Sequence, residues 1–281
     1  MNAEGRLSVA IQGEAGSFSH QAALEILGDG LALLPQRSFD AVFDAVTDGA
    51  AEQGVVPIEN SLTGSIHENY DRLSERGLNI VGETQLRVRH CLIGLPGVGI
   101  DEIQRVASHP VALAQCRRFF AQHPAVEAVA AYDTAGSVIE MLRAGKRSHA
   151  ALASRLAATL HGGEVLLEGV EDDPQNFTRF LLMARESGPV ERATKTSIVF
   201  TLDNVPGALF KALEVFARRG VDLSKIESRP LRGRPWEYAF YLDVLGDPRG
   251  AAGEAVSELQ RGAAELRVLG SYPEGLKKRP T

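Results

Sequence analysis

The feature that most constrains the fold of this chain is a long extended segment, residues 78–93 (LNIVGETQLRVRHCLI). It is long enough to leave one lobe of a protein and enter another. A second apolar run, residues 180–183, follows a polar stretch at 175–179 and is typical of a strand that enters a core. We interpret the two segments as a chain that crosses between two lobes and returns. The cleft between the lobes is then the expected ligand site.

Short apolar strands alternate with helices before the second crossing, which predicts an α/β fold. The layout resembles the two hinged lobes of periplasmic binding proteins (type II), roughly residues 1–83 plus 165–187 and residues 84–164. Helix caps are expected at Ser17 or Ser19, at Ser38, at Asp133 or Thr134, and at Ser154. The predicted strands are residues 7–12, 54–56, 105–109, 128–131, 150–153 and 165–167, and two of the predicted helices are residues 65–76 and 111–122.

A polar stretch with Gly and Pro, residues 186–192, marks a domain boundary, so the first domain is residues 1–187. The second domain, residues 194–273, has a compact pattern. Its predicted strands are residues 197–202, 223–229, 236–245 and 266–269, and its predicted helices are residues 208–219 and 250–262. This βαββαβ order predicts a ferredoxin-like fold whose exposed sheet edge suits dimerisation.

Composition narrows the class of protein. A length of 281 residues allows about two domains, and the formal net charge of −6 argues against a nucleic-acid-binding surface. The two cysteines have no metal-ligand spacing, which favours free thiols in a reducing cytosol, and the seven histidines form no HExxH motif. We find neither a signal-peptide pattern nor an apolar run of membrane-spanning length. We therefore expect a cytoplasmic protein with no metal site.

Polar residues at strand ends form the candidate site. Asn176 and Thr178 share one face of the predicted returning strand, and Arg179 takes the other face. Residues 59–61 are expected in a loop, because Pro57 cannot extend a central ladder. The glycine turn at 13–17 leads into a helix and could bind an anion through backbone N–H groups. A solvated edge strand and a plain βα turn are the structural alternatives.

Several motifs together resemble prephenate dehydratase with a C-terminal ACT regulatory domain. The resemblance covers nearly the whole chain, and the pair of Thr-Arg-Phe and Glu-Ser-Arg-Pro in this order is its most specific part. The motifs are GEAGSFSH at 13–20, VPIENS at 56–61, SHP at 108–110, NFTRF at 176–180, GAL at 207–209 and ESRP at 227–230.

The resemblance implies a cofactor-free lyase that converts prephenate to phenylpyruvate. Thr178 would lie nearest the leaving hydroxyl as a hydrogen-bond donor, and the Arg179 fork would suit a carboxylate. Glu59 would orient a neighbour or act as an acid. The catalytic set it implies is Asn176, Phe177, Thr178, Arg179, Glu59, Asn60 and Ser61, and the substrate-binding set is Ser17, Ser19, His20, Gln21 and Thr134.

In the small domain the resemblance implies that phenylalanine is an inhibitor bound at an ACT dimer seam, in a homodimer or homotetramer. The turn before Ala208 exposes backbone N–H groups at a helix start, which suit an amino-acid carboxylate. Glu227 could bind the ammonium group, or could pair with Arg229 to shape the loop. The expected effector residues are Asn204, Gly207, Ala208, Leu209, Glu227, Ser228, Arg229 and Pro230.

Two other functions compete with this one. An arogenate dehydratase would perform the same chemistry on a substrate that carries an amino group. A non-catalytic amino-acid sensor would combine a binding-protein-like module with an ACT domain, although an intact Thr178 argues against it.

Overall fold

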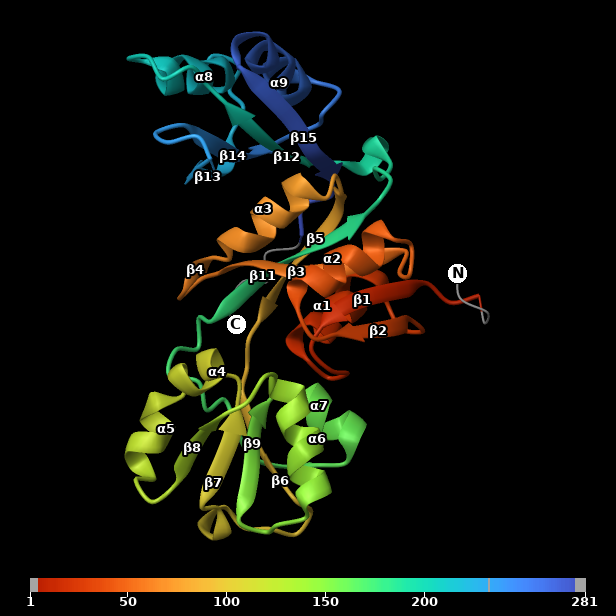
Figure 1. The fold of residues 1–281 in the computed structure, drawn as a ribbon, viewed down its shortest axis with the longest axis vertical. Coiled ribbons are helices and arrows are strands. Elements are labelled where there is room, and N and C mark those ends of the chain that lie inside the picture. Colours follow the sequence, from red (N-terminus) through yellow and green to blue (C-terminus); the bar gives the residue numbers. More distant parts are fainter. Residues whose placement is uncertain (1–4, 232, 276–281) are drawn as a thin grey trace. The chain divides into compact units, whose positions relative to one another are not determined.

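The structure is a computed structural model that describes residues 5–231 and 233–275 (Figure 1). These residues form two compact units. The first contains residues 5–70 and 84–182, and the second contains residues 71–83, 183–231 and 233–275. The second unit thus includes a segment from the expected first domain. Residues 1–4 and 232 of the two expected domains lie outside the described part.

The first sheet holds the strands before the first crossing and the returning strand. Its order is β2 (Ala32–Gln36), β1 (Ser8–Gln12), β3 (Gln53–Asn60), β11 (Phe177–Ala184) and β5 (Asn79–Arg87), with β4 (Gly64–Ser65) paired to β3. Its helices are α1 (Phe18–Leu27), α2 (Phe39–Thr47) and α3 (His67–Glu75). Ser17 and Ser38 cap α1 and α2, as predicted, and each side chain accepts a backbone N–H three residues on.

The expectation that Pro57 ends its strand is wrong, because β3 runs through it to Asn60. The pairing of β3 with β1 ends at Ile11↔Val55, two residues before Pro57. A proline is tolerated where no neighbouring strand needs its missing N–H. As a result Glu59 and Asn60 belong to a strand next to β11, and Ser61 begins the turn that follows.

The second sheet has the order β10 (Glu164–Glu168), β6 (Cys91–Gly94), β9 (His149–Ala153), β7 (Arg105–Ser108) and β8 (Glu127–Ala130). The sequence placed residues 165–167 in the first lobe, but β10 pairs antiparallel with β6. The return to the first sheet therefore falls between β10 and β11. The helices are α4 (Pro110–Ala114), α5 (Arg117–Gln122), α6 (Thr134–Ala144) and α7 (Arg155–His161).

Alternate side chains of this sheet fill two different cores, as the two-residue period of a strand requires. Ile93 and Ala151 pack with α6 and α7, whereas Leu92 and Leu152 pack with Phe119 of α5. The single helix expected at 111–122 is two short helices, α4 and α5, which are separated at Gln115 and Cys116. Asp133 caps α6 and Ser154 caps α7, both within the range of the predicted caps.

The βαββαβ prediction for the last domain is confirmed. Strands β13 (Leu223–Pro230), β14 (Tyr238–Leu245), β12 (Lys195–Thr201) and β15 (Glu265–Tyr272) form the sheet in that order, with β13 at one edge. The helices α8 (Ala208–Ala217) and α9 (Ala251–Gly262) lie on one side of it (Figure 1). Ile198 and Phe200 of β12 pack with Phe216 of α8 and Leu259 of α9 in this core.

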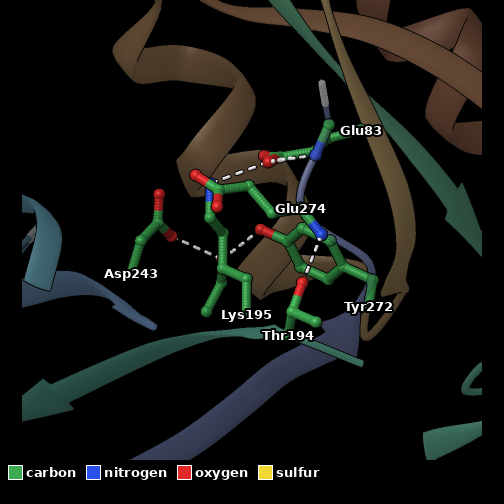
Figure 2. A network of polar contacts seen from close by, with 8 residues as sticks. Glu83, Thr194, Lys195, Asp243, Tyr272 and Glu274 are labelled. Carbon is green, nitrogen blue, oxygen red and sulfur yellow. Dashed lines mark hydrogen bonds and ion pairs between the residues drawn. The ribbon is translucent and has the colours of Figure 1, made fainter. Parts of the chain in front are cut away.

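The sheet of the second unit also carries a buried ionic network (Figure 2). The Lys195 ammonium lies 2.7 Å from Oε1 of Glu83 in β5, and the two side chains are 3% and 0% exposed. Glu274 lies 3.5 Å from the same ammonium. Beside it, the Ser197 hydroxyl donates to Asp243 at 2.5 Å. The network ties residue 83 to the C-terminal sheet, which explains why the second unit extends beyond the expected domain.

Arg267 adds a second connection within this unit. Its guanidinium donates to the backbone carbonyls of Ser74 at 2.6 Å and Leu78 at 2.8 Å. Carbonyls at the end of a helix have no partner inside the helix, so a cation there stabilises the last turn of α3. Arg229 of β13 pairs with Asp71 of α3 at 3.0 Å.

The first lobe contacts the second through the loop before α1. The Glu14 N–H donates to the Asp133 carboxylate at 3.1 Å, and the Ser154 hydroxyl donates to the Gly16 carbonyl at 2.5 Å. His161 donates to the Ala15 carbonyl at 2.7 Å. All of these residues belong to the first compact unit, and the bonds hold the loop against the starts of α6 and α7.

Lys195→Ala is expected to lower the free energy of unfolding by about 3–5 kcal/mol, because it leaves the buried Glu83 carboxylate without its cation. The double variant Lys195→Met/Glu83→Leu removes both charges and should be more stable than Lys195→Ala. Urea unfolding measures both. The control is Arg249→Ala, whose pair with Asp247 is exposed and whose loss should barely move the midpoint. A wild-type midpoint for Lys195→Ala would contradict this prediction.

Gly16→Ala is expected to destabilise the first unit more than Gly30→Ala does. Both glycines have positive φ, 91° and 88°, so both variants carry strain of roughly 1–2 kcal/mol. Only at Gly16 would the added Cβ meet backbone, 2.6 Å from the Ala157 Cα, whereas nothing lies within 4 Å at Gly30. Thermal unfolding compares the two, and equal midpoints would show that the loop is not packed tightly against α7.

Candidate active site

Thr178 lies near the start of β11 and is 8% exposed. Its hydroxyl oxygen accepts a hydrogen bond from the Asn60 side-chain amide at 2.9 Å. The same amide nitrogen lies 2.7 Å from Asn176 Oδ1 and 3.1 Å from the Phe177 carbonyl. The predicted shared face of Asn176 and Thr178 is therefore confirmed, and the hydroxyl sits in a polar cluster rather than in hydrocarbon.

The orientation of Asn60 follows from its other end. Its Oδ1 accepts from the backbone N–H groups of Leu62 and Thr63, both at 3.0 Å. Backbone N–H groups only donate, so the oxygen must face them and the NH₂ must face Thr178. The Thr178 oxygen is consequently an acceptor in this cluster, and its own hydrogen is left for an acceptor outside it.

Ser61 fixes the backbone that directly precedes Thr178. Its N–H donates to the Phe177 carbonyl at 2.8 Å, and its hydroxyl accepts from the Phe177 N–H at 2.9 Å. The hydroxyl donates in turn to the Gln175 carbonyl at 2.7 Å. The end of β3 is thus bonded to the first residues of β11, which holds the strand that carries Thr178 in register.

Two residues that the sequence did not single out extend this cluster. Gln115 Oε1 accepts from the Asn176 amide at 2.9 Å and lies 3.0 Å from His90 Nε2. His90 follows β5 in the first crossing, and Phe18 of α1 contacts its ring edge-on, with centroids 5.4 Å apart. Burial lowers the pKa of His90. The break between α4 and α5 is the one feature that would have marked Gln115 as a candidate, and nothing in the sequence predicts that break.

The glycine turn before α1 was predicted to bind an anion through its backbone N–H groups. Two of these N–H groups are already bonded to side chains of the protein. The Gly16 N–H donates to His20 Nδ1 at 3.0 Å, and the Glu14 N–H is taken by Asp133. Burial lowers the pKa of His20 and raises that of Asp133. Since Nδ1 of His20 accepts, a neutral ring carries its proton on Nε2. The backbone N–H groups that could still bind an anion are therefore those in the first turn of α1.

The remaining predicted residues lie on α1, α6, β11 and β3, and none of them is among the hydrogen-bond partners of Thr178 described above. Ser17 caps α1 and is buried, and Ser19 and Gln21 follow in its first turn. Thr134 is the first residue of α6, directly after Asp133, and is buried. Arg179 is buried on β11, beside Thr178, and Glu59 precedes Asn60 on β3.

A cavity of about 360 Å³ opens at the start of α8, within the second unit. Four of the predicted effector residues line it, namely Asn204, Gly207, Ala208 and Leu209. Gly207 caps α8 with a φ of 79°, a left-handed conformation that suits glycine. Three aromatic residues that sequence reasoning missed, Trp236, Tyr238 and Phe240, also line the cavity. The spacing of Tyr238 and Phe240 was an available signal, because it places both side chains on one face of β14. Trp236 lies in the turn before β14 with a φ of 69°, so the strand predicted at 236–245 begins two residues later.

The other four predicted effector residues lie on β13 and are not among the residues that line this cavity. The Glu227 carboxylate lies 2.9 Å from the Lys225 ammonium, and Arg229 pairs with Asp71. These ion pairs differ from the Glu227–Arg229 pair considered from the sequence. Ser228 and Pro230 alternate with them and are exposed. The structure therefore separates the predicted effector residues into two groups.

Three findings concern the wider chemistry of the chain. Cys91 and Cys116 are free and buried, as predicted. Within residues 5–231 and 233–275, no cluster of three or more His, Cys, Asp or Glu side chains is placed to hold a metal ion. Over the same residues, every helix is too short or too polar to cross a lipid bilayer.

Comparison with known proteins identifies both domains. The prephenate dehydratase family matches residues 9–188, and the ACT domain family matches residues 196–254. Arogenate dehydratase/prephenate dehydratase 2 of Arabidopsis thaliana, named as chloroplastic, is 44% identical over 95% of this chain and 73% of its own length. The family match covers well over half of the chain.

Solved structures share the whole fold. The prephenate dehydratase of Arthrobacter aurescens in complex with L-Phe has a TM-score of 0.85 at 32% identity, over 98% of this chain and 92% of its own. GqqA, named as a novel type of quorum quenching acylase, has a TM-score of 0.87 at 36% identity, over 97% and 100%. The chain thus belongs to the prephenate dehydratase family, with a periplasmic-binding-protein-like (type II) catalytic domain followed by an ACT domain.

Proposed function

We propose that this protein is a prephenate dehydratase that uses the Thr178 hydroxyl to assist the departure of the ring hydroxyl. The observation that carries the proposal is the pinned Asn60 amide, which donates to Thr178 and leaves the threonine proton free. Prephenate loses carbon dioxide, the electron pair of the broken C–C bond enters the ring, and hydroxide leaves from the opposite carbon. Aromatisation drives the step, so it requires neither a covalent nucleophile nor a redox cofactor.

Thr178 contributes as a positioned donor rather than as a strong acid. A hydrogen bond to the leaving oxygen strengthens as negative charge develops there. As the hydroxyl proton moves toward that oxygen, negative charge grows on Thr178 Oγ1, and the Asn60 N–H stabilises it. Both groups are held in place before the reaction, so little reorganisation is needed at the transition state. The proton that converts hydroxide to water comes from solvent; the Thr178 hydroxyl relays it and is reprotonated in the same step.

Substrate carboxylates require cations and neutral donors. We assign Arg179 to one carboxylate, because its planar fork matches two oxygens. Ser17, Ser19, His20 and Gln21 at the start of α1, with Thr134 at the start of α6, supply donors for the other carboxylate. Glu59 orients a neighbour, since an ionised carboxylate beside a dianion would repel it.

The ACT domain gives the enzyme feedback control by phenylalanine. The cavity at the start of α8 supports this role, since it combines backbone at a helix N-terminus with aromatic side chains. A relative of this fold has been solved with L-Phe bound. Glu227 and Arg229 of β13 act in the same response, as parts of the sheet face that contacts α3.

The edge strand β13 supports assembly into a homodimer or homotetramer, because its outer edge can pair with a second copy. The buried free thiols Cys91 and Cys116 suit a reducing compartment, and we assign the protein to the cytoplasm. The plant relatives are named as chloroplastic enzymes.

Arogenate is the competing substrate, since relatives at 44% identity are named arogenate dehydratases. A fold neighbour named as an acylase shows that this architecture hosts other chemistry. Direct turnover is therefore the test. Purified protein is mixed with prephenate or with arogenate, and phenylpyruvate absorbance in alkali or phenylalanine formation is followed. Turnover of prephenate at least tenfold faster supports the proposal, and turnover of arogenate alone would replace it.

Thr178→Ala is expected to lower kcat at least 100-fold without unfolding the protein, because it removes the donor to the leaving oxygen. Thr178→Ser keeps a hydroxyl and should retain more activity. Thr159→Ala, on the exposed side of α7, is the matched control and should behave as wild type. Near-full activity of folded Thr178→Ala would end the assignment of this site.

Gly207→Ala is expected to relieve inhibition by phenylalanine, since the added methyl group enters the α8 cavity at the helix start. Gly220→Ala is the matched control: it has a similar positive φ near the other end of α8 and open space around it. Prephenate turnover is titrated with phenylalanine for both variants. Equal inhibition in the two would place the effector elsewhere in the domain.

A further inference from the structure

The two crossings between the lobes meet beside the catalytic strand. His90 lies in the first crossing, between β5 and β6, and Asn176 ends the second, just before β11. The crossings are bonded to each other: the Val88 N–H donates to the Asn176 carbonyl at 2.8 Å, and the Val170 N–H donates to the His90 carbonyl at 3.1 Å. Gln115, from the break between α4 and α5 in the second lobe, lies between the His90 and Asn176 side chains.

The side chains of Asn60, Asn176, Gln115 and His90 form a series of hydrogen bonds. Backbone N–H groups fix the orientation of Asn60, and the direction of each later bond follows from the one before it. Asn60 Oδ1 faces two backbone N–H groups, so the Asn60 nitrogen donates to Asn176 Oδ1. The nitrogen of Asn176 must then face Gln115 and donate to its Oε1. Because that Gln115 oxygen only accepts, the nearby Nε2 of His90 must carry a hydrogen. No free choice of amide orientation remains from Asn60 to His90.

His90 is therefore held as one particular form. Its Nε2 donates, and its Nδ1 is buried without a hydrogen-bond partner among the residues that the structure describes. A second proton would have to sit on Nδ1, where no acceptor is available. Burial lowers the pKa of the ring, in agreement with a neutral imidazole. The Glu171 carboxylate accepts from the His90 backbone N–H at 2.9 Å.

We propose that His90 and Gln115 are positioning residues for the dehydration: they hold the Asn176 side chain against the Asn60 amide, so that the Thr178 hydroxyl points its hydrogen at the substrate. The proposal rests on the assigned role of Thr178. Neither residue touches the reacting atoms. Their effect passes through the Asn176 side chain, which donates to Gln115 and accepts from the Asn60 amide. The backbone N–H groups of Leu62 and Thr63 already fix the Asn60 amide, so His90 and Gln115 act on the position of Asn176 beside it.

The chain also makes the catalytic hydroxyl depend on the second lobe. Gln115 is the member that comes from that lobe, and its backbone carbonyl accepts from the Asp172 N–H at 2.6 Å in the return crossing. If the second lobe shifts away, Asn176 loses the acceptor for its NH₂. The Asn176 side chain is then held only through its bond with Asn60, and its contact with the group that orients Thr178 becomes looser. This happens although every residue of the first lobe is still in place.

Four variants test the proposal. Gln115→Met and His90→Leu remove one acceptor and one donor while roughly keeping volume, and kcat for prephenate should fall on the order of 10- to 100-fold, the cost of a small misplacement. KM should change less than about threefold, because ground-state contacts remain. His90→Gln places an amide N–H near the former Nε2 and should restore kcat to within about threefold of wild type. Gln122→Met, exposed at the end of α5, is the matched control.

A spectroscopic measurement separates positioning from general damage. Nitrogen-15 NMR of histidine-labelled protein, with His90 assigned by its loss in His90→Gln, should show a neutral ring protonated at Nε2 from pH 6 to 8. Gln115→Met should shift that Nε2 signal.

Wild-type kcat in folded Gln115→Met, or an Nδ1-protonated His90, would overturn the proposal. If His90→Leu does not fold, Gln115→Met and the NMR signal decide. A wild-type enzyme that turns over neither substrate would refute the proposed function, and the ring tautomer would still test the hydrogen-bond chain by itself.

Discussion

The structure of the active site depends on one side chain whose two ends are held by different kinds of partner. Asn60 offers its oxygen to two backbone N–H groups and its nitrogen to the oxygens around Thr178. A backbone N–H group can only donate a hydrogen bond, so the Asn60 amide has one allowed orientation. Everything else in the cluster inherits that orientation. The cost of burying the Asn60 and Asn176 amides is offset by their hydrogen bonds, and the same bonds fix the orientation of both amides.

The cluster is built mostly from neutral groups, which suits a doubly negative substrate. A buried carboxylate near Thr178 would repel prephenate, and a buried lysine would titrate with its surroundings. Amides, hydroxyls and a neutral imidazole avoid both problems while still presenting dipoles. In the mechanism we propose, the cation that binds substrate is Arg179, which follows the threonine on the same strand. The division of labour between dipoles and charges follows from the charge of the substrate.

Local chemistry made much of this predictable. Caps at Ser17 and Ser38, the βαββαβ order and the shared face of Asn176 and Thr178 all follow from residues close in sequence. The errors concern partners far away in the chain. Nothing near Pro57 tells that β1 stops pairing before it, and the short run at 165–167 does not state which sheet it joins. His90 and Gln115 were missed for the same reason, since their role exists only where two crossings and a helix break meet.

The shared compact unit has a consequence for dissecting this enzyme. A catalytic fragment that ends at the family boundary near residue 188 would keep Glu83 but lose Lys195, and would keep the end of α3 but lose the guanidinium of Arg267. Excision would thus expose the Glu83 carboxylate, which is fully buried in the whole protein, and the backbone carbonyls that Arg267 binds. The boundary between the two family domains thus cuts through one compact unit. The buried carboxylate of Glu83 in the catalytic domain is neutralised by Lys195 of the regulatory domain.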